Sequence, residues 1–263
     1  LFSQYTARHL GRLHRLHVSS CQSLERIFTN DGDKAVAAVT SMGEIVFQKL
    51  DSLKLISLPY LTSFCPEMVN SQYSDGPTHP PLFDQKIIFP SLEELTLYWL
   101  YNVKEIWHQQ LSAMNNFQKL RVLKIHDCCS LITVIPSNLI QRLQNLEELY
   151  VGWCDLVEEV FELDGHETVM LPQIRELKLS KLPRLKNMWW NKVPHGFESL
   201  KNLKSLDIYQ CNGLRYLFSP SAWRGLIQLQ RLEIDSCKIL KEIVAIERGE
   251  DEEQDSCMMK EEI

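Results

Sequence analysis

A twelve-residue pattern, L-x-x-L-x-L-x-x-C/L-x-x-L with Ile or Val accepted for Leu, occurs eight times along the 263-residue chain. The copies begin at Leu13, Leu50, Leu92, Leu120, Leu146, Ile174, Leu203 and Leu229. The starts are 37 and 42 residues apart for the first two intervals and 26 to 29 apart afterwards. Eight matches in one register are not a chance pattern. They constrain the chain to an array of similar structural units.

The physical basis of the pattern is burial on one side. The two apolar residues of L-x-L point the same way from a short strand, because side chains alternate along a strand. One unit cannot bury this face alone, so neighbouring units stack and share a continuous core. The pattern is that of leucine-rich repeats. It predicts the α/β fold class: a leucine-rich-repeat solenoid with a curved parallel β-sheet on the concave face and an irregular convex side with short helices.

The return segments of the repeats contain three further features. Apolar pairs are expected to close the turns into the core at 27–28, 106–107, 160–161, 217–218 and 243–244. Short convex helices or 3₁₀ turns are predicted over 137–143 and 221–226, where Ser or Pro can start a helix. Residues 29–44 and 66–86 replace ordinary turns with longer segments, which we expect to be mobile surface excursions.

The charge of the chain is concentrated at one end. Residues 1–246, the predicted repeat array, are neutral, whereas residues 247–263 carry the whole net charge of −6. We interpret 247–263 as an acidic, solvated and mobile segment. A neutral array predicts no binding of nucleic acid. The absence of an apolar run of about 18 residues predicts no membrane span.

The cysteines follow the repeat. Five of the eight occupy the ninth position of the pattern, namely Cys21, Cys128, Cys154, Cys211 and Cys237. A cysteine at this position is expected to be a small buried residue with a weak S–H donor, so we interpret these five as reduced structural thiols. Reduced cysteines and the lack of any N-x-S/T sequon favour a cytoplasmic or nuclear protein that is not secreted.

Motifs for catalysis are missing. The chain has no P-loop, no G-x-G-x-x-G, no G-x-S-x-G, no H-E-x-x-H and no C-x-x-C. Acid pairs such as Glu93-Glu94 and Glu147-Glu148 are adjacent in sequence, so on a strand they face opposite sides. We therefore predict a protein that is not an enzyme, with no catalytic residue, no bound cofactor and no metal site in this chain.

The exposed positions of the predicted sheet offer a surface for a protein partner. The fifth, seventh and eighth positions of the pattern collect lysines and aromatic residues, and the fifth column changes from basic to acidic along the stack. Exposed Tyr and Trp commonly anchor protein interfaces. The tryptophans have a second interpretation, in which they fold back over the strand-to-loop corner and cover their neighbours. The candidate binding residues are Lys54, Tyr98, Trp99, Lys124, His126, Tyr150, Trp153, Lys178 and Tyr209.

The repeat unit, with F-P-S-L-E-E-L-T-L at 89–97 and L-P-R-L-K-N-M-W at 182–189, resembles a known family. It is similar to the C-terminal repeat region of plant coiled-coil NBS-LRR (NLR) disease-resistance proteins. The resemblance implies that 247–263 is an inter-repeat loop followed by further repeats. It implies an intracellular immune receptor that senses pathogen effectors or guarded host proteins and restrains a nucleotide-binding module. ADP or ATP is expected only in that module, which this chain lacks.

A different class of protein remains an alternative: the substrate-recognition arm of an F-box type ubiquitin-ligase adaptor. Such arms also use cysteine-bearing repeats but commonly follow the cysteine with Ile/Leu-Thr-Asp and a downstream Gly-Leu. Here the residues after the cysteine run Q-S-L-E-R-I, C-S-L-I-T-V or K-I-L-K-E-I, without the Thr-Asp step. This difference favours the immune-receptor interpretation.

Overall fold

The computed structural model describes residues 2–3, 10–29, 44–65, 80–108, 116–162, 171–188 and 200–245. The acidic segment 247–263 lies outside the described residues, as do 30–43 and 66–79 of the two long inserts.

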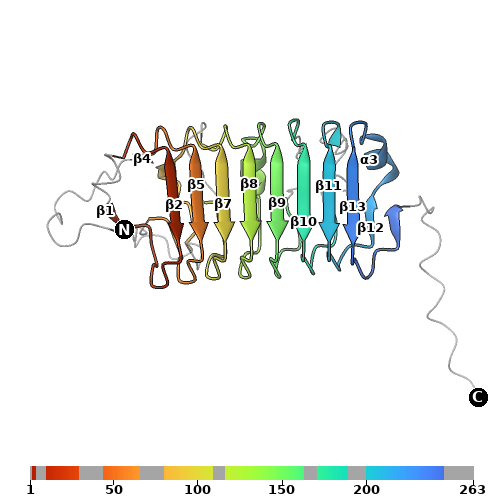
Figure 1. The fold of residues 1–263 in the computed structure, drawn as a ribbon, viewed down its shortest axis with the longest axis horizontal. Coiled ribbons are helices and arrows are strands. Elements are labelled where there is room, and N and C mark those ends of the chain that lie inside the picture. The colour runs from red at the N-terminus through yellow and green to blue at the C-terminus, as the bar shows by residue number, and fades with distance from the viewer. Residues whose placement is uncertain are drawn as a thin grey trace, which may run out of the picture.

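One long parallel sheet organises these residues. Its eight strands lie side by side in chain order, and all run in the same direction (Figure 1). Each repeat contributes one five-residue strand that spans positions three to seven of the pattern. The strands are β2 (Arg15–Ser19), β5 (Ser52–Ile56), β7 (Glu94–Tyr98), β8 (Val122–His126), β9 (Glu148–Gly152), β10 (Glu176–Ser180), β11 (Ser205–Tyr209) and β13 (Arg231–Asp235). The predicted leucine-rich-repeat fold is confirmed.

The strands pair in a constant register, so each position of the pattern forms a column across the sheet. Leu123 of β8, for example, pairs with Leu95 of β7 on one side and Leu149 of β9 on the other. The apolar residues of L-x-L face the core, and those of β5 to β11 are almost fully buried. The residues between them face the open side of the sheet, which we also call the concave face. The pattern that predicted the strands therefore also decides which side chains are available to a partner.

A tight turn follows every strand of the long sheet. The residue at the eighth position has a positive φ in all eight repeats, between 49° and 57°, although none of these residues is glycine. In the first seven repeats its N–H donates to the seventh-position carbonyl of the following repeat, as in Trp99 N–H to His126 O at 3.0 Å. The left-handed conformation turns the chain inward, and the bond to the next repeat repays part of its conformational cost.

The ninth-position residues form a ladder directly inside this turn. Cys128, Cys154 and Cys211 are buried, and the S–H of Cys211 donates to the carbonyl of Leu179 in the preceding repeat at 3.6 Å. Burial raises the pKa of the Cys211 thiol to about 12, so it remains protonated at neutral pH. The seven described cysteines are free thiols, as expected. Cys21 and Cys237, at the two ends of the array, are only half-buried.

The opposite side of the array contains short pairings instead of a second continuous sheet. The paired strands are β1 (Phe2–Ser3) with β3 (Phe28–Thr29), β4 (Ile45–Val46) with β6 (Ile87–Ile88), and β12 (Tyr216–Phe218) with β14 (Glu242–Val244). Two single-turn helices, α2 (Ser137–Ile140) and α3 (Pro220–Arg224), confirm the predicted helical segments. In α3, Ser219 caps the helix by accepting a hydrogen bond from Ala222 N–H at 3.2 Å.

Two expectations about the return segments were wrong. Within 66–86, Leu82 and Phe83 are fully buried, and Phe83 contacts the ring of Phe64 at a centroid distance of 5.5 Å. This part of the insert is core because its apolar side chains complete the packing between the second and third repeats. In the last repeat, Ile243 is 44% exposed instead of closing a turn into the core. No later repeat among the described residues covers it.

Candidate protein-binding surface

The nine candidate residues all lie on the open face of the sheet or in the turn directly after a strand. Seven of them belong to the strands, and Trp99 and Trp153 occupy the turns after β7 and β9. From β7 to β11 the constant register brings residues that are 26 to 29 positions apart in sequence next to one another. Lys124, for example, pairs with Tyr150, and Tyr150 pairs with Lys178.

The three candidate lysines form ion pairs with acids on the strand that follows. Lys54 Nζ lies 3.6 Å from Glu94, Lys124 Nζ lies 3.7 Å from Glu148, and Lys178 Nζ lies 3.8 Å from Asp207. The first two pairs are about half exposed, so each stabilises the fold little. Asp207 of the third pair is more buried, with 20% of its side chain exposed. The sequence analysis did not identify the acids as partners, because a cross-strand pair becomes visible only when the register is known.

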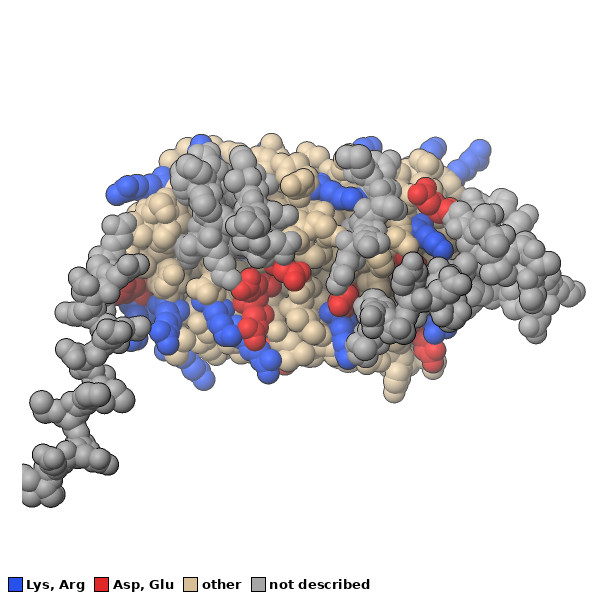
Figure 2. All heavy atoms as spheres, turned by 180° about the vertical axis from the view of Figure 1, so that it is seen from behind, with Lys and Arg blue, Asp and Glu red and all other residues tan. Residues whose placement is uncertain are grey.

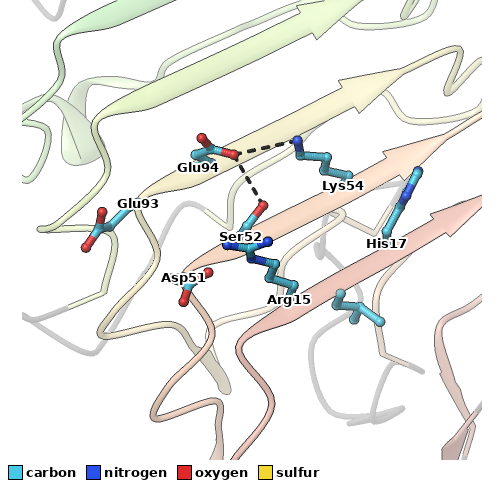
Figure 3. A pocket seen from close by; sticks show the side chains of 8 residues that line it. Arg15, His17, Asp51, Ser52, Lys54, Glu93 and Glu94 are labelled. Atoms are coloured by element: carbon cyan, nitrogen blue, oxygen red, sulfur yellow. Dashed lines mark hydrogen bonds and ion pairs between the residues drawn. The ribbon is translucent and has the colours of Figure 1, made fainter.

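The first of these lysines lies beside a depression of about 580 Å³ across β2, β5 and β7. Figure 3 shows Glu94 bonded to both Lys54 and Ser52, with Arg15 on the neighbouring strand opposite Ser52. The Ser52 hydroxyl donates to Glu94 at 3.3 Å. Charges of both signs line this depression, so it shows no preference for a charged ligand.

Five candidate residues from β7, β8 and β9 and their turns form one continuous aromatic cluster around His126. The imidazole is stacked on Tyr150 at a centroid distance of 5.7 Å and an interplanar angle of 23°. The centroids of Tyr98, Trp99 and Trp153 lie 5.4, 6.1 and 5.8 Å from that of His126. We call Tyr98, Trp99, His126, Tyr150 and Trp153 the aromatic cluster.

The two tryptophans cover neighbouring groups at the corner and also remain partly exposed. Trp99 Nε1 donates to Asp127 Oδ2 at 3.0 Å, and Lys181 Nζ lies 3.3 Å from the ring centroid of Trp153. The rings thus cover neighbouring groups at the corner, while Trp99 keeps 37% and Trp153 41% of its surface exposed. Large exposed rings that are held by neighbours lose little rotamer entropy on binding, which is the property of an interface anchor.

His126 lies at the centre of this cluster in an apolar environment. Desolvation lowers the pKa of His126 below its usual value, Lys181 lowers it further, and Asp127 acts in the opposite direction. The Nδ1 atom is shielded from solvent and has no hydrogen-bond partner among the described residues. The imidazole is therefore neutral at pH 7, and its shielded Nδ1 atom lies within an aromatic surface.

Gly152 creates the space that the cluster occupies. A Cβ at this position would collide with Ser180 Oγ and would lie 3.0 Å from the Tyr150 hydroxyl and 3.3 Å from His126 Cδ2. The Tyr150 hydroxyl and Ser180 Oγ are 3.3 Å apart and share a hydrogen bond. The sequence analysis missed the structural roles of Gly152, Ser180 and Lys181. A seventh-position glycine between aromatic neighbours was the available signal.

Tyr209 is separated from the aromatic cluster by β10. It is 38% exposed, it pairs with Asp235 of β13, and it lines a depression of about 300 Å³ that reaches Tyr150 and Lys178. The acids Asp207, Glu233 and Asp235 outnumber the bases Lys178 and Arg231 at this end of the sheet, in agreement with the basic-to-acidic trend of the fifth column. Tyr209 thus belongs to the same face but to a different electrostatic environment.

The described residues contain no group of three or more His, Cys, Asp or Glu side chains that could hold a metal ion. Within the same residues, no helix is long and apolar enough to cross a membrane.

Comparison with known proteins places these features in a family. The chain is 26% identical over 172 residues to the disease resistance protein At4g27190 of Arabidopsis thaliana, a match that covers 65% of this chain and 16% of the relative. It is also 24% identical over 152 residues to the human volume-regulated anion channel subunit LRRC8D, a match that covers 55% of this chain and 16% of that relative. The chain thus spans a small part of the length of these relatives.

The family model "Plant disease resistance protein RPS2-like, leucine-rich repeats" matches residues 1–72 and 91–238, which is most of the chain. The match covers the strands of the long sheet and the aromatic cluster. The chain therefore belongs to the RPS2-like leucine-rich-repeat family of plant disease resistance proteins.

Proposed function

We propose that this chain is the recognition and regulatory repeat region of an intracellular plant immune receptor. In this role its concave face senses a pathogen effector or a guarded host protein, and the array restrains a nucleotide-binding module outside this chain. The chain itself binds no nucleotide and catalyses no reaction. The receptor acts in the cytoplasm or the nucleus.

The aromatic cluster is the observation that carries the proposal. It places two tyrosines on a parallel sheet, where backbone pairing on both sides fixes their positions, and two exposed tryptophans in the turns directly after the strands. A preorganised surface of Trp and Tyr has the composition of an interface hot spot. Lys54, Lys124 and Lys178, at the fifth position of their repeats, provide a polar rim for the same surface.

The test uses the full-length receptor expressed in leaf tissue that is challenged with a panel of pathogen isolates. We expect the double variant Tyr150→Ala/Trp153→Ala to lose the cell-death response to a recognised isolate. Trp223→Ala is the matched control, because Trp223 is 45% exposed on α3, away from the concave face. The control should keep the response. A double variant that accumulates and responds like the wild type would contradict the proposal.

The regulatory part is tested separately, by deleting residues 1–245 from the full-length receptor. If the array restrains the nucleotide-binding module, the deletion should produce cell death without a pathogen or raise nucleotide exchange in the purified protein. The F-box alternative predicts a different result, since a ubiquitin-ligase arm would co-purify with a Skp1-type adaptor and its loss would stabilise a substrate.

A further inference from the structure

A charged surface separate from the concave face lies on the edge of the sheet where the strands end. Positions ten to fourteen of the last three repeats are residues 183–187, 212–216 and 238–242. They hold a single acid, Glu242, and five exposed bases, which we call the basic edge: Arg184, Lys186, Arg215, Lys238 and Lys241.

The sign of the charge reverses within one repeat. The equivalent residues of the fifth repeat, 155–159, hold three acids and no base. Lys186 Nζ bonds Glu158 Oε2 at 2.8 Å across this boundary. It is the one ion pair that the described residues supply to the basic edge. The bond to Lys186 holds the pKa of the Glu158 carboxyl below its usual value.

The repeat geometry places bases of successive repeats next to one another. Lys186, Arg215 and Lys241 occupy the thirteenth position of successive repeats, and Lys241 N–H donates to the Arg215 carbonyl at 2.9 Å. Stacked rungs lie about 4.8 Å apart. Like charges on adjacent rungs repel each other. Figure 2 shows Lys and Arg side chains gathered along the edge where the strands end, toward the C-terminal half of the array.

The basic edge also surrounds a hollow. A depression of about 760 Å³ is lined by the three bases Arg184, Lys186 and Arg215 and by one acid, Glu158, together with Tyr216 and Ile239. Gly213 lies in its lining, and a Cβ there would collide with the Leu185 carbonyl. The requirement for glycine leaves the eleventh position of this repeat without a side chain between two rows of bases. The surface is therefore concave, cationic and partly apolar.

We infer that the basic edge is a docking surface for a short acidic segment of a partner protein. Three rungs span about 10 Å, which an extended chain covers with about three to five residues. Glu158 already pairs with Lys186, so charge complementarity requires carboxylates opposite Arg215 and Lys241, and apolar side chains fit against Tyr216 and Ile239. The acids of 155–159 terminate the run of positive charge, so the segment is acidic over a short stretch only.

Nucleic acid fits this surface less well than an acidic polypeptide does. The positive run is short, and acids bound it on two sides, in 155–159 along the edge and at Asp207, Glu233 and Asp235 on the concave face. A phosphate backbone carries its charge continuously and would extend into these acids. The basic edge and the aromatic cluster occupy different surfaces, so both can be occupied in one complex.

Fluorescence anisotropy tests the inference. The probe is a fluorescein-labelled peptide with a short run of glutamates, an aromatic residue at one end, and Gly-Ser flanks. We expect it to bind the chain with an affinity that falls as salt rises. Arg215→Glu/Lys241→Glu should weaken binding by about tenfold or more. Lys49→Glu/Lys119→Glu reverses two exposed lysines on the edge where the strands begin and should leave binding unchanged.

Three other outcomes would overturn the inference. The first is equal binding by the two double variants, when both keep the wild-type melting temperature. The second is stronger binding of a single-stranded DNA oligomer than of the peptide. The third is binding by a chain that ends at residue 246 but not by the whole chain, because the acidic residues 247–263 would then be the occupant. None of these results bears on the concave face, so the proposed function is tested independently.

Discussion

At the residue scale, the eighth position serves both the turn and the surface. Trp99 and Trp153 both have φ = 55°, a conformation that is rare for a bulky side chain. Six other residues, among them Ser57 and Lys181, adopt it at the same position. The strain is therefore a property of the repeat turn and not of the tryptophans. The turn projects whichever residue it holds outward at the rim of the concave face.

The buried thiol of Cys154 gives the first residue-scale prediction. Its S–H donates to the Gly152 carbonyl at 3.2 Å, and a hydrogen bond with Cys128 together with burial raises its pKa well above the usual range. Cys154→Ser should lower the free energy of unfolding by roughly 1–3 kcal/mol, because a buried hydroxyl is imperfectly satisfied there. Urea unfolding measures the change. Cys237→Ser, at a half-buried position, should change it by about 0.5 kcal/mol or less.

His126 gives a prediction about pH. Its pKa is lowered in the folded protein, so between the folded and unfolded values the unfolded chain binds more protons. The neutral ring's contribution to the free energy of unfolding is fully present above about pH 6.5. It is lost as the pH falls through that value toward the pKa of the folded protein. The melting temperature should drop between pH 7.5 and pH 5.5, and His126→Phe should reduce the drop.

His17 is the matched control for this measurement, because it is exposed on β2 of the same face. His17→Gln should keep the wild-type difference between the two pH values. If His126→Phe also keeps it, the cluster does not hold the imidazole in its neutral form.

At the element scale, each strand depends on its two neighbours. Leu206 of β11 is fully buried between β10 and β13, whereas Leu232, the equivalent residue of β13, is only partly buried. Leu206→Ala should lower the free energy of unfolding by about 2–5 kcal/mol through lost contacts and a residual cavity. Leu232→Ala should cost clearly less, because that site already borders solvent. Calorimetry compares the two variants, and equal costs would show that β13 is covered in solution.

At the scale of the whole molecule, the two ends of the array differ. At the first strand, Leu16 and Val18 keep only 8% and 6% of their surface exposed. At the last repeat, Ile227 is 72% exposed and Ile243 is 44% exposed, beside partly buried core residues of β13. The outer edge of β13 is also the end of the hydrogen-bonded sheet among the described residues. Repeat arrays need a polar cap at such an end for solubility.

We expect the isolated chain to self-associate through this end. Light scattering should report species larger than the 30.7 kDa of one chain. Ile227→Lys/Ile243→Lys should shift the population toward monomer, because charges on the exposed end oppose apolar contact. A monodisperse wild-type monomer would show that the end is protected in solution.

The repeat pattern in the sequence specifies the fold and the side of the sheet on which each side chain lies. Period-2 alternation within L-x-L and the 26-to-29-residue spacing specify stacked parallel strands, because a one-sided apolar strand can be buried only against a copy of itself. The same pattern placed the nine candidate residues on the open face. The predicted burial was wrong for Leu82, Phe83 and Ile243, because burial there depends on whether a neighbouring unit is present.

Contacts between exposed residues follow from the stacking of the repeats and cannot be read from the sequence pattern. The pairs Lys124–Glu148 and His126–Tyr150 join residues 24 apart in sequence, and the register of neighbouring strands brings each pair into contact. Register across a sheet depends on hydrogen bonds between repeats and on the lengths of the returns, which differ from repeat to repeat. The aromatic cluster and the basic edge are therefore properties of the stacked array, to which each repeat contributes only one or two side chains.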